Sequence, residues 1–241
     1  MIKQDEVLDV LSEGLFLLQK KRGFKYGVDS ILLTSFFKCR FNDRVLEFGS
    51  GTGVISLLIN KIYNAKVTGI EIQKDYVDMS NRTLKINAIK NVEFIHGDFC
   101  NLNNHYQAGS IDVIVSNPPY FKTDIVSNNQ SKSLARHEIA MDLERLVISA
   151  SRLLKNRGNL FLLYPTDRLQ ELLYVFQKYN LSLRNMRFVH SKINEKSHIS
   201  LITAVKNTNS QVIIHPPLIL YDTSGYTQDL LDIYRKLEME K

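Results

Sequence analysis

Hydrophobic positions along the chain form short runs that alternate with longer segments of helical periodicity. A glycine-rich turn follows residue 48, and the pattern after it predicts a helix that begins at Val54. Further helices are predicted over about 75–87, 143–154 and 167–179. Gly158 is expected to close the helix over 143–154. The short apolar runs predict seven strands, at 44–48, 66–70, 92–96, 111–115, 159–164, 183–189 and 199–205. Alternation of strands with helices predicts an α/β fold with a seven-stranded, mostly parallel sheet and helices on both faces.

The two ends of the chain lie outside this alternating core. Residues 1–40 are expected to form an N-terminal extension, with a short hairpin over 15–26 that has a basic tip. Asp29 and Ser30 are expected to cap the helix that follows, and a place for Asp29 in a pocket stays open. Residues 207–241 are expected to form a C-terminal extension, in which Pro216 and Pro217 allow only an edge strand before a short terminal helix. We expect residues 1–241 to form one domain.

A glycine-rich turn follows the first strand of the core. Gly49, Gly51 and Gly53 leave room for a cofactor to approach the backbone at the amino end of the next helix. Glu71 ends the second strand 22 positions after Gly49, where an acidic residue hydrogen-bonds a ribose diol. The fingerprint of a nicotinamide dinucleotide has its third glycine five places after the first, and that position is Val54 here. The spacing therefore disfavours a dinucleotide.

The fourth strand runs into the segment Ser116-Asn117-Pro118-Pro119-Tyr120. Because proline cannot donate to a ladder, the strand stops here, at the sheet edge where open α/β folds bind ligands. The Asn117 side-chain oxygen and the Pro118 carbonyl can accept the N–H groups of a planar, conjugated nitrogen, while Tyr120 offers a surface for stacking. This combination predicts methyl transfer to such a nitrogen. A plain tight turn is the alternative interpretation.

The charge balance is compatible with a polyanionic partner. Lys and Arg number 31 and Asp and Glu number 25, which gives a net charge of +6 and a pI near 9.2. Cations interleaved with aromatic residues favour binding of unpaired nucleic acid, although a solvated basic loop has the same composition. The candidates for phosphate contacts are Lys20, Lys21, Arg22 and Lys25, together with Lys122, Lys132 and Arg136 in the polar segment 122–140.

The remaining composition is that of an ordinary globular protein, with 44% hydrophobic and 23% charged residues. Cys39 and Cys100 show no metal-ligand spacing, so no metal site or disulfide framework is indicated. No apolar run is long enough for a membrane span, and the first residues lack a signal-peptide pattern. We therefore expect a cytoplasmic protein.

Seven motifs together resemble the bacterial valine-tRNA adenine-N6 methyltransferases. They occur in the order residues 25–29, 47–53, 69–73, 97–98, 116–121, 135–138 and 216–219. The resemblance spans nearly the whole chain and implies a class I methyltransferase (Rossmann-like) fold with S-adenosylmethionine as cofactor. It also implies tRNA as the partner, with methylation of the exocyclic amino group of the adenine just 3′ of the anticodon.

The resemblance further assigns roles to residues. It implies that Glu47, the three glycines, Glu71 and Asp98 hold the cofactor, with Asp98 accepting a hydrogen bond from its adenine amino group. Asn117 and Pro118 would orient the target amino group beside the cofactor, and Tyr120 and Phe121 would stack on the base. Glu47 and Phe48 replace the Asp and Leu that are more common in this turn, and both changes keep its character.

Two other functions stay open at this point. The Asn-Pro-Pro-Tyr motif is shared with DNA adenine methyltransferases and with the glutamine methyltransferases of release factors. Phe121 and the stretch Ile70-Glu71-Ile72-Gln73 favour the tRNA branch. A non-catalytic RNA-binding module with the same fold is the hypothesis from another class. The oligomeric state is left open by the sequence.

Overall fold

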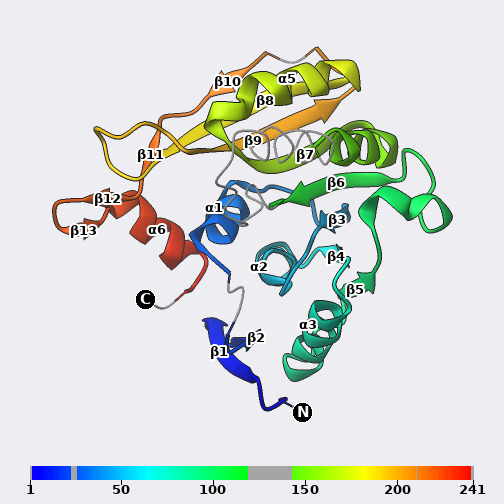
Figure 1. The fold of residues 1–241 in the computed structure, drawn as a ribbon, viewed down its shortest axis with the longest axis vertical. Helices are drawn as coiled ribbons and strands as arrows, with labels where there is room; N and C mark the ends of the chain where they lie inside the picture. Colours follow the sequence, from blue (N-terminus) through cyan, green and yellow to red (C-terminus); the bar gives the residue numbers. More distant parts are fainter. Residues whose placement is uncertain (1, 23–25, 119–142, 210, 240–241) are drawn as a thin grey trace, which may run out of the picture.

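The structure is a computed structural model that describes residues 2–22, 26–118, 143–209 and 211–239 (Figure 1). In this part of the chain the central sheet has nine strands in the order β10-β8-β9-β7-β6-β3-β4-β5, with β11 also paired to β8. The strands are β3 (Arg44–Phe48), β4 (Lys66–Glu71), β5 (Val92–His96), β6 (Ile111–Ser116), β7 (Leu154–Pro165), β8 (Leu181–His190), β9 (Ile199–Lys206), β10 (Ile213–Ile214) and β11 (Leu218–Ile219).

This architecture confirms the predicted α/β class. Strands β5, β4, β3, β6 and β7 are parallel, and β9 is antiparallel to both β7 and β8. All seven predicted strands are present. The two additional strands, β10 and β11, have two residues each and pair with β8 at the edge of the sheet.

Helices cover both faces of the sheet because successive side chains of each strand point to opposite faces. Val113 and Val115 of β6 pack in one apolar cluster with α1 (Val28–Phe36), α2 (Val54–Tyr63) and α3 (Lys74–Ile86). Ile114, between them, packs in a second cluster with the helix over residues 143–153 and with α5 (Leu169–Lys178). Figure 1 shows α5 and α2 on opposite sides of the sheet.

The N-terminal hairpin differs from the prediction. Strand β1 (Glu6–Ser12) pairs with β2 (Leu15–Lys20), so the turn lies at Glu13 and Gly14, and Gly14 has a φ of +67°. The basic residues Lys20, Lys21 and Arg22 therefore lie at the end of β2. The prediction that they form the tip of the hairpin was wrong. The prediction missed β1 as the partner strand. The carbonyl of Asp5, the residue before β1, also accepts a hydrogen bond from the Lys21 amide (2.9 Å).

The predicted cap of α1 was also wrong. The helix begins at Val28 with Gly27 as N-cap residue and no side-chain capping hydrogen bond. Asp29 and Ser30 therefore lie inside the first turn. Asp29 is half-buried there, and its loss of solvation raises the pKa of its carboxyl.

Gly158 has a different role from the expected helix end. Strand β7 starts at Leu154, directly after the helix over 143–153, and its register against β6 shifts between the pairs Ile111–Leu154 and Val113–Asn159. A Cβ atom at Gly158 would lie 2.9 Å from the Lys155 carbonyl oxygen and 3.0 Å from the Asp112 carbonyl oxygen. Gly158 thus permits a close approach of backbones in the bulge at the start of β7.

The C-terminal segment follows the expected course. Strand β11 lies at the sheet edge, and a small hairpin of β12 (Tyr221–Asp222) and β13 (Gly225–Tyr226) precedes α6 (Gln228–Lys236). Thr227 caps α6 by accepting a hydrogen bond from the Leu230 amide. Leu230 joins the same apolar cluster as α1 and α2. That residues 1–40 and 207–241 are extensions of one domain stays a prediction. Among the described helices, none is long and apolar enough to cross a membrane.

Candidate active site

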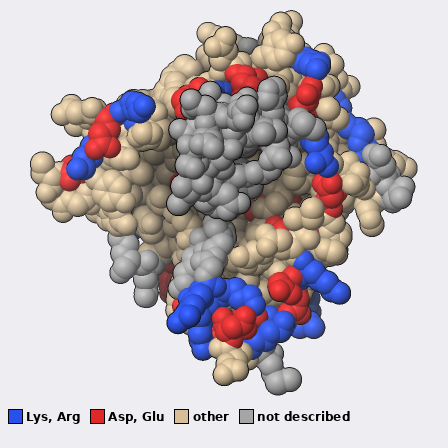
Figure 2. Space-filling model, viewed as in Figure 1, with Lys and Arg blue, Asp and Glu red and all other residues tan. Residues whose placement is uncertain are grey.

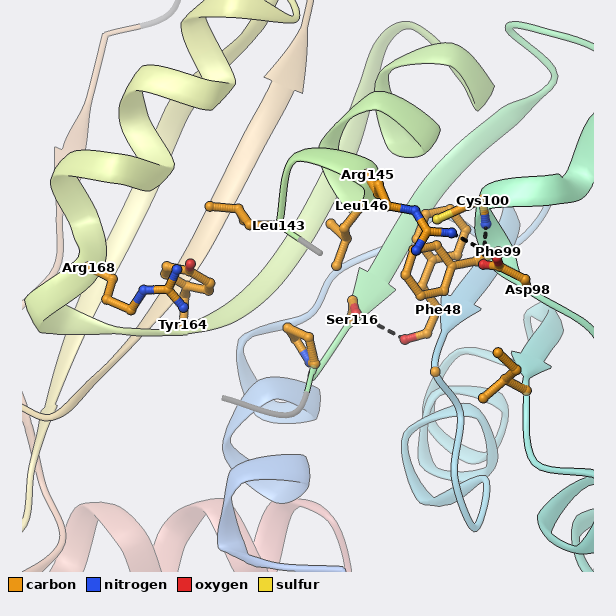
Figure 3. Close-up of a pocket in the computed structure, with 13 residues that line it drawn as sticks. Phe48, Asp98, Phe99, Cys100, Ser116, Leu143, Arg145, Leu146, Tyr164 and Arg168 are labelled. Atoms are coloured by element: carbon orange, nitrogen blue, oxygen red, sulfur yellow. Dashed lines mark hydrogen bonds and ion pairs between the residues drawn. The ribbon is translucent and has the colours of Figure 1, made fainter. Parts of the chain in front are cut away.

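A cavity of about 220 Å³ lies at the carboxyl ends of the five parallel strands (Figure 3). The described residues that line it are Phe48, Gly49, Ile72, Asp98, Phe99, Cys100, Ser116, Pro118, Leu143, Arg145, Leu146, Tyr164 and Arg168. Figure 3 shows Arg145 and Asp98 at one end, Tyr164 and Arg168 at the other, and Ser116 between them. The cavity is therefore at the sheet edge where the sequence predicted the site.

The glycine-rich turn forms one wall of this cavity. Gly49, Gly51 and Gly53 have φ values of +71°, +52° and +83°, a region that residues with a Cβ rarely adopt. The amides of Gly49 and Ser50 both donate to the Ile70 carbonyl of β4, at 2.9 and 3.1 Å. A Cβ at Gly53 would lie 2.4 Å from the Phe94 ring. The backbone of the turn is thus held against β4 and β5 and is open to a ligand at Gly49.

Glu71 lies beside this turn, as its spacing predicted. One carboxylate oxygen accepts a hydrogen bond from the Gly51 amide (2.8 Å) and the other accepts one from the Gln73 amide (2.9 Å). Glu71 is only 5% exposed. Because each carboxylate oxygen has two lone pairs, both oxygens keep acceptor capacity for a hydroxyl group of a ligand.

Glu47 lies underneath the turn and does not line the cavity. Its carboxylate is 1% exposed and accepts hydrogen bonds from the Ser56 amide (3.0 Å) and the Ser56 hydroxyl. Burial raises the pKa of Glu47 to about 8, although both hydrogen bonds from Ser56 act in the opposite direction. Ser56 is in the first turn of α2, so Glu47 stabilises the start of this helix by accepting hydrogen bonds from it. Glu47 therefore does not face the cavity, and its part in cofactor binding stays a prediction.

Asp98 follows β5 and faces the cavity from the other side. It accepts hydrogen bonds from the Cys100 amide (2.9 Å) and the Asn101 side chain (3.2 Å), which cap the short 3₁₀ segment η1 (Phe99–Asn104). Arg145 of the helix over 143–153 forms an ion pair with it at 3.0 Å. The Phe99 ring stacks on Phe48 at 4.8 Å between centroids. Asp98 is thus fixed in the cavity wall with an oxygen toward Arg145.

The described part of the Asn-Pro-Pro-Tyr motif starts in the middle of the cavity. The Ser116 hydroxyl donates to the Phe48 carbonyl (2.9 Å), which ties the end of β6 to the end of β3. Since Phe48 and Ser116 are paired in register, the next residues of the two strands are Gly49 and Asn117. Pro118 lines the cavity. The motif and the glycine turn therefore leave the sheet on neighbouring strands.

Several predicted site residues lie outside the described part of the chain. They are Tyr120, Phe121, Lys25, Lys122, Lys132 and Arg136. The whole polar segment 122–140, which holds three of the candidates for phosphate contacts, lies outside it as well. Their roles stay predictions.

Two of the three described cations that the sequence predicted as phosphate contacts near residues 20–25 have partners within the protein. Lys20 forms an ion pair with Asp5 at 2.6 Å, which raises the pKa of Lys20, and the Lys21 ammonium donates to the Gln4 carbonyl (2.7 Å). Arg22 is exposed. Figure 2 shows blue and red side chains intermingled at this end of the molecule. The hairpin end is therefore close to charge balance.

Sequence reasoning missed Arg168 and Tyr164 at the far end of the cavity. Arg168 forms a two-pronged contact with Glu171, from Nε to one oxygen (3.0 Å) and from Nη2 to the other (2.9 Å), and lies 5.5 Å from the centre of the Tyr164 ring. Its Nη1 is buried and has no hydrogen-bond partner among the described residues. The cavity thus offers a hydrogen-bond donor at this end. In the sequence, Arg168 looked like an ordinary residue of a helix start.

Comparison with known proteins decides the family. A family model described as a methyltransferase domain matches residues 41–215. The chain is 31% identical over 170 residues to a tRNA1(Val) (adenine(37)-N6)-methyltransferase of Phocaeicola vulgatus, which covers 70% of this chain and 71% of that protein. The chain belongs to this methyltransferase family. A protein of the same name from Flavobacterium johnsoniae is 28% identical over 92% of this chain and 95% of its own.

The fold of this family member has a close counterpart among solved structures. A predicted O-methyltransferase from Agrobacterium tumefaciens superimposes with a TM-score of 0.69, covers 88% of this chain and 98% of its own, and is 18% identical. At that identity the likeness concerns the fold alone. It confirms the class I methyltransferase architecture that the sequence resemblance implied.

The cavity suits S-adenosylmethionine, the methyl donor of such methyltransferases. The turn presents backbone without side chains at Gly49, Glu71 offers carboxylate oxygens next to it, and Asp98 offers another at the end of the next strand. This cofactor is a cation with no pyrophosphate, so carboxylates near the turn suit its charge. Among the described residues, no group of three or more His, Cys, Asp and Glu side chains could hold a metal ion.

Proposed function

We propose that this methyltransferase transfers a methyl group from S-adenosylmethionine to the N6 amino group of an adenine in tRNA, next to the anticodon of valine tRNA. The observation that carries this proposal is that two segments leave the sheet side by side, at the ends of neighbouring strands. Asn117 and Pro118 follow β6 at the position where the glycine turn follows the neighbouring strand β3. An acceptor held by the first segment is therefore next to a donor held by the second. The relatives named above support the tRNA substrate.

The residues of the motif overcome the poor nucleophilicity of the target nitrogen. Its lone pair is delocalised into the ring, and S-adenosylmethionine, when bound, supplies an activated methyl group on a sulfonium sulfur. The Asn117 side-chain oxygen and the Pro118 carbonyl accept the two amino hydrogens, which turns the lone pair toward the methyl group and stabilises the charge that develops on nitrogen. Transfer is direct and in line: as the nitrogen–carbon bond forms, the bond between the methyl carbon and the sulfonium sulfur breaks and its electron pair stays on sulfur. The methylated nitrogen then releases one proton to water.

The far end of the cavity receives the rest of the acceptor. An adenine in an anticodon loop is unpaired, so turning it out of the loop costs less than from a duplex. Tyr120 and Phe121 stack on the base in this proposal. Arg168 supports this placement of the acceptor nucleotide at the far end of the cavity, because its buried Nη1 can donate a hydrogen bond to a polar atom of that nucleotide. The substrate places the reaction in the cytoplasm.

Replacement of Asn117 separates binding from chemistry. Asn117→Ala should bind S-adenosylmethionine as tightly as the unmodified protein in calorimetry, but lose about a hundredfold or more in turnover, since one preorganised polar contact to the reacting group is gone. The matched control is Asn91→Ala, an exposed asparagine whose side-chain amide donates a hydrogen bond to Asn64 (3.1 Å). Near-normal turnover of Asn117→Ala would mean that the motif is merely a turn.

A further inference from the structure

A second cleft, separate from the cavity of the active site, carries an excess of positive charge. It has a volume of about 660 Å³ and lies between the carboxyl end of α1, strands β7, β8 and β9, and the C-terminal segment. Its lining includes Lys38, Arg184, Arg187 and Lys236. Among the described residues that line it, none is Asp or Glu.

Most cations of this cleft differ from Lys3, Lys20 and Arg82 at the hairpin end, which pair with nearby carboxylates. Lys38, Arg184 and Lys236 are exposed, and no ion pair joins them to a carboxylate in the described part of the chain. Arg187 is held in place by the Pro216 carbonyl, which accepts from its Nε at 3.0 Å, and its Nη2 is 3.5 Å from Asp229 at the side.

The hairpin end shows the opposite arrangement. Lys20 pairs there with Asp5, and Lys3 pairs with Asp78 at 2.7 Å. Arg82 contacts the buried carboxylate of Glu6. Four cations line the cleft and no carboxylate is among its described lining residues, so the cleft carries a local excess of positive charge.

The cleft starts close to the proposed catalytic motif. Phe161 of β7 forms part of its wall, and Phe161 is paired in register with Val115 of β6, the residue before Ser116. Neighbouring strands are about 4.8 Å apart, so this wall is one strand from the motif. Phe161 points to the α1 side of the sheet, where Phe36 meets its ring edge-on at 6.5 Å. A substrate that reaches the active site from the α1 side would pass the cleft.

We propose that this cleft binds the phosphate backbone of the tRNA outside the anticodon loop while the target adenine occupies the active site. The inference rests on the proposed function, because it takes tRNA as the substrate. Lysine and arginine side chains bind backbone phosphates without reading the bases, and they release counterions on binding. The cleft positions the tRNA, and the cavity selects the base.

The test compares two triple variants that remove the same charge. The cleft variant combines Lys38→Ala, Arg184→Ala and Lys236→Ala. The control combines Lys66→Ala, Lys85→Ala and Lys90→Ala, three exposed lysines around β4 and α3 without a described ion pair. Affinity for unmodified tRNA is measured by fluorescence anisotropy between about 50 and 200 mM salt, where phosphate contacts dominate.

The cleft variant should bind tRNA at least about tenfold more weakly at the lowest salt, with a salt slope smaller by roughly 2 to 3. The control variant should keep a slope close to that of the unmodified protein. A charge-preserving variant with Lys38→Arg, Arg184→Lys and Lys236→Arg should retain the slope. Calorimetry with S-adenosylmethionine should give the same affinity for all of them.

Methyl transfer to tRNA by the unmodified protein is measured in parallel. If transfer occurs and the cleft variant keeps the full slope and affinity, the cleft proposal is wrong and the proposed function stands. If the unmodified protein transfers no methyl group to tRNA, the proposed function is wrong and the cleft proposal falls with it.

Discussion

At the scale of single residues, two buried carboxylates stabilise the glycine-rich turn from different sides. Glu71 accepts from the amide of Gly51 inside the turn, and Glu47 accepts from Ser56 just beyond it. Glu71 also borders the space where a ribose would lie in the proposed complex. Glu47 is shielded beneath the turn. The two residues should therefore respond differently to substitution.

Glu71→Ala should weaken S-adenosylmethionine binding roughly ten- to a hundredfold, because it removes a charge-assisted hydrogen bond worth on the order of 1.5–3 kcal/mol. Calorimetry measures the affinity, and circular dichroism checks that the variant is folded. Glu93→Ala is the matched control, since Glu93 is an exposed carboxylate on β5 that contacts Thr68. An unchanged affinity in folded Glu71→Ala would remove Glu71 from the cofactor site.

Glu47→Gln should change the pH dependence of stability. The pKa of Glu47 is raised from 4.5 to about 8 in the folded protein, so between these values the folded state binds a proton that the unfolded state has lost. The contribution of Glu47 to the free energy of unfolding is therefore fully present below about pH 4.5. It falls by up to about 1.4 kcal/mol for each pH unit as the pH rises toward 8.

Urea denaturation at a series of pH values measures this effect. Glu47→Gln carries no titrating proton, so its stability relative to the unmodified protein should rise between pH 5 and pH 8. Parallel pH profiles for the two proteins would contradict a raised pKa at Glu47.

Sequence analysis could predict the position of a residue when it depends only on one strand and the turn that follows it. Glu71 ends β4 and Asp98 follows β5, and parallel strands bring their carboxyl ends to one sheet edge. Arg145 and Arg168 escaped notice because their importance depends on tertiary packing. Arg145 meets Asp98 across 47 positions of sequence, and neither arginine is in a motif.

At the scale of elements, the alternation of apolar runs and helical periodicity was sufficient for the sheet and its covering helices. The errors lie at ends and turns, where a few hydrogen bonds decide the geometry. Asp29 was expected outside α1 as a cap, but the helix starts earlier, at Gly27 and Val28. The bulge that Gly158 allows depends on β6, which is distant in sequence, and no local pattern reveals it.

Gly158→Ala should destabilise the protein by about 1–3 kcal/mol, because its Cβ would press on two backbone oxygens that cannot rotate away. Gly97→Ala is the control, since a Cβ at Gly97 would have no atom within 4 Å, and its effect should be within about 0.5 kcal/mol. Urea denaturation gives both values. Equal stability of the two variants would show that the β6–β7 bulge can relax without cost.

At the scale of the whole molecule, the distribution of charge matters more than its sum. The net charge of +6 is compatible with a polyanionic partner but does not identify the surface that would bind it. The cations of the cleft come from three segments that are far apart in sequence: Lys38 follows α1, Arg184 and Arg187 belong to β8, and Lys236 belongs to α6. The basic segment at residues 20–25 looked like a stronger candidate in the sequence because four of its six residues are cations, three of them consecutive. The ion pair of Lys20 with Asp5, the residue before β1, depends on the pairing of β1 with β2, which the sequence analysis did not predict.

The central claim is that the acceptor is an adenine of tRNA. The most direct measurement incubates the protein and S-adenosylmethionine with unmodified bulk tRNA and, separately, with release factor, and analyses digests of both by mass spectrometry. Asn117→Ala serves as the inactive control in each arm. We predict N6-methyladenosine in the anticodon loop of a single tRNA species, and none with Asn117→Ala. Methylglutamine in the release factor together with unmodified tRNA would contradict the claim.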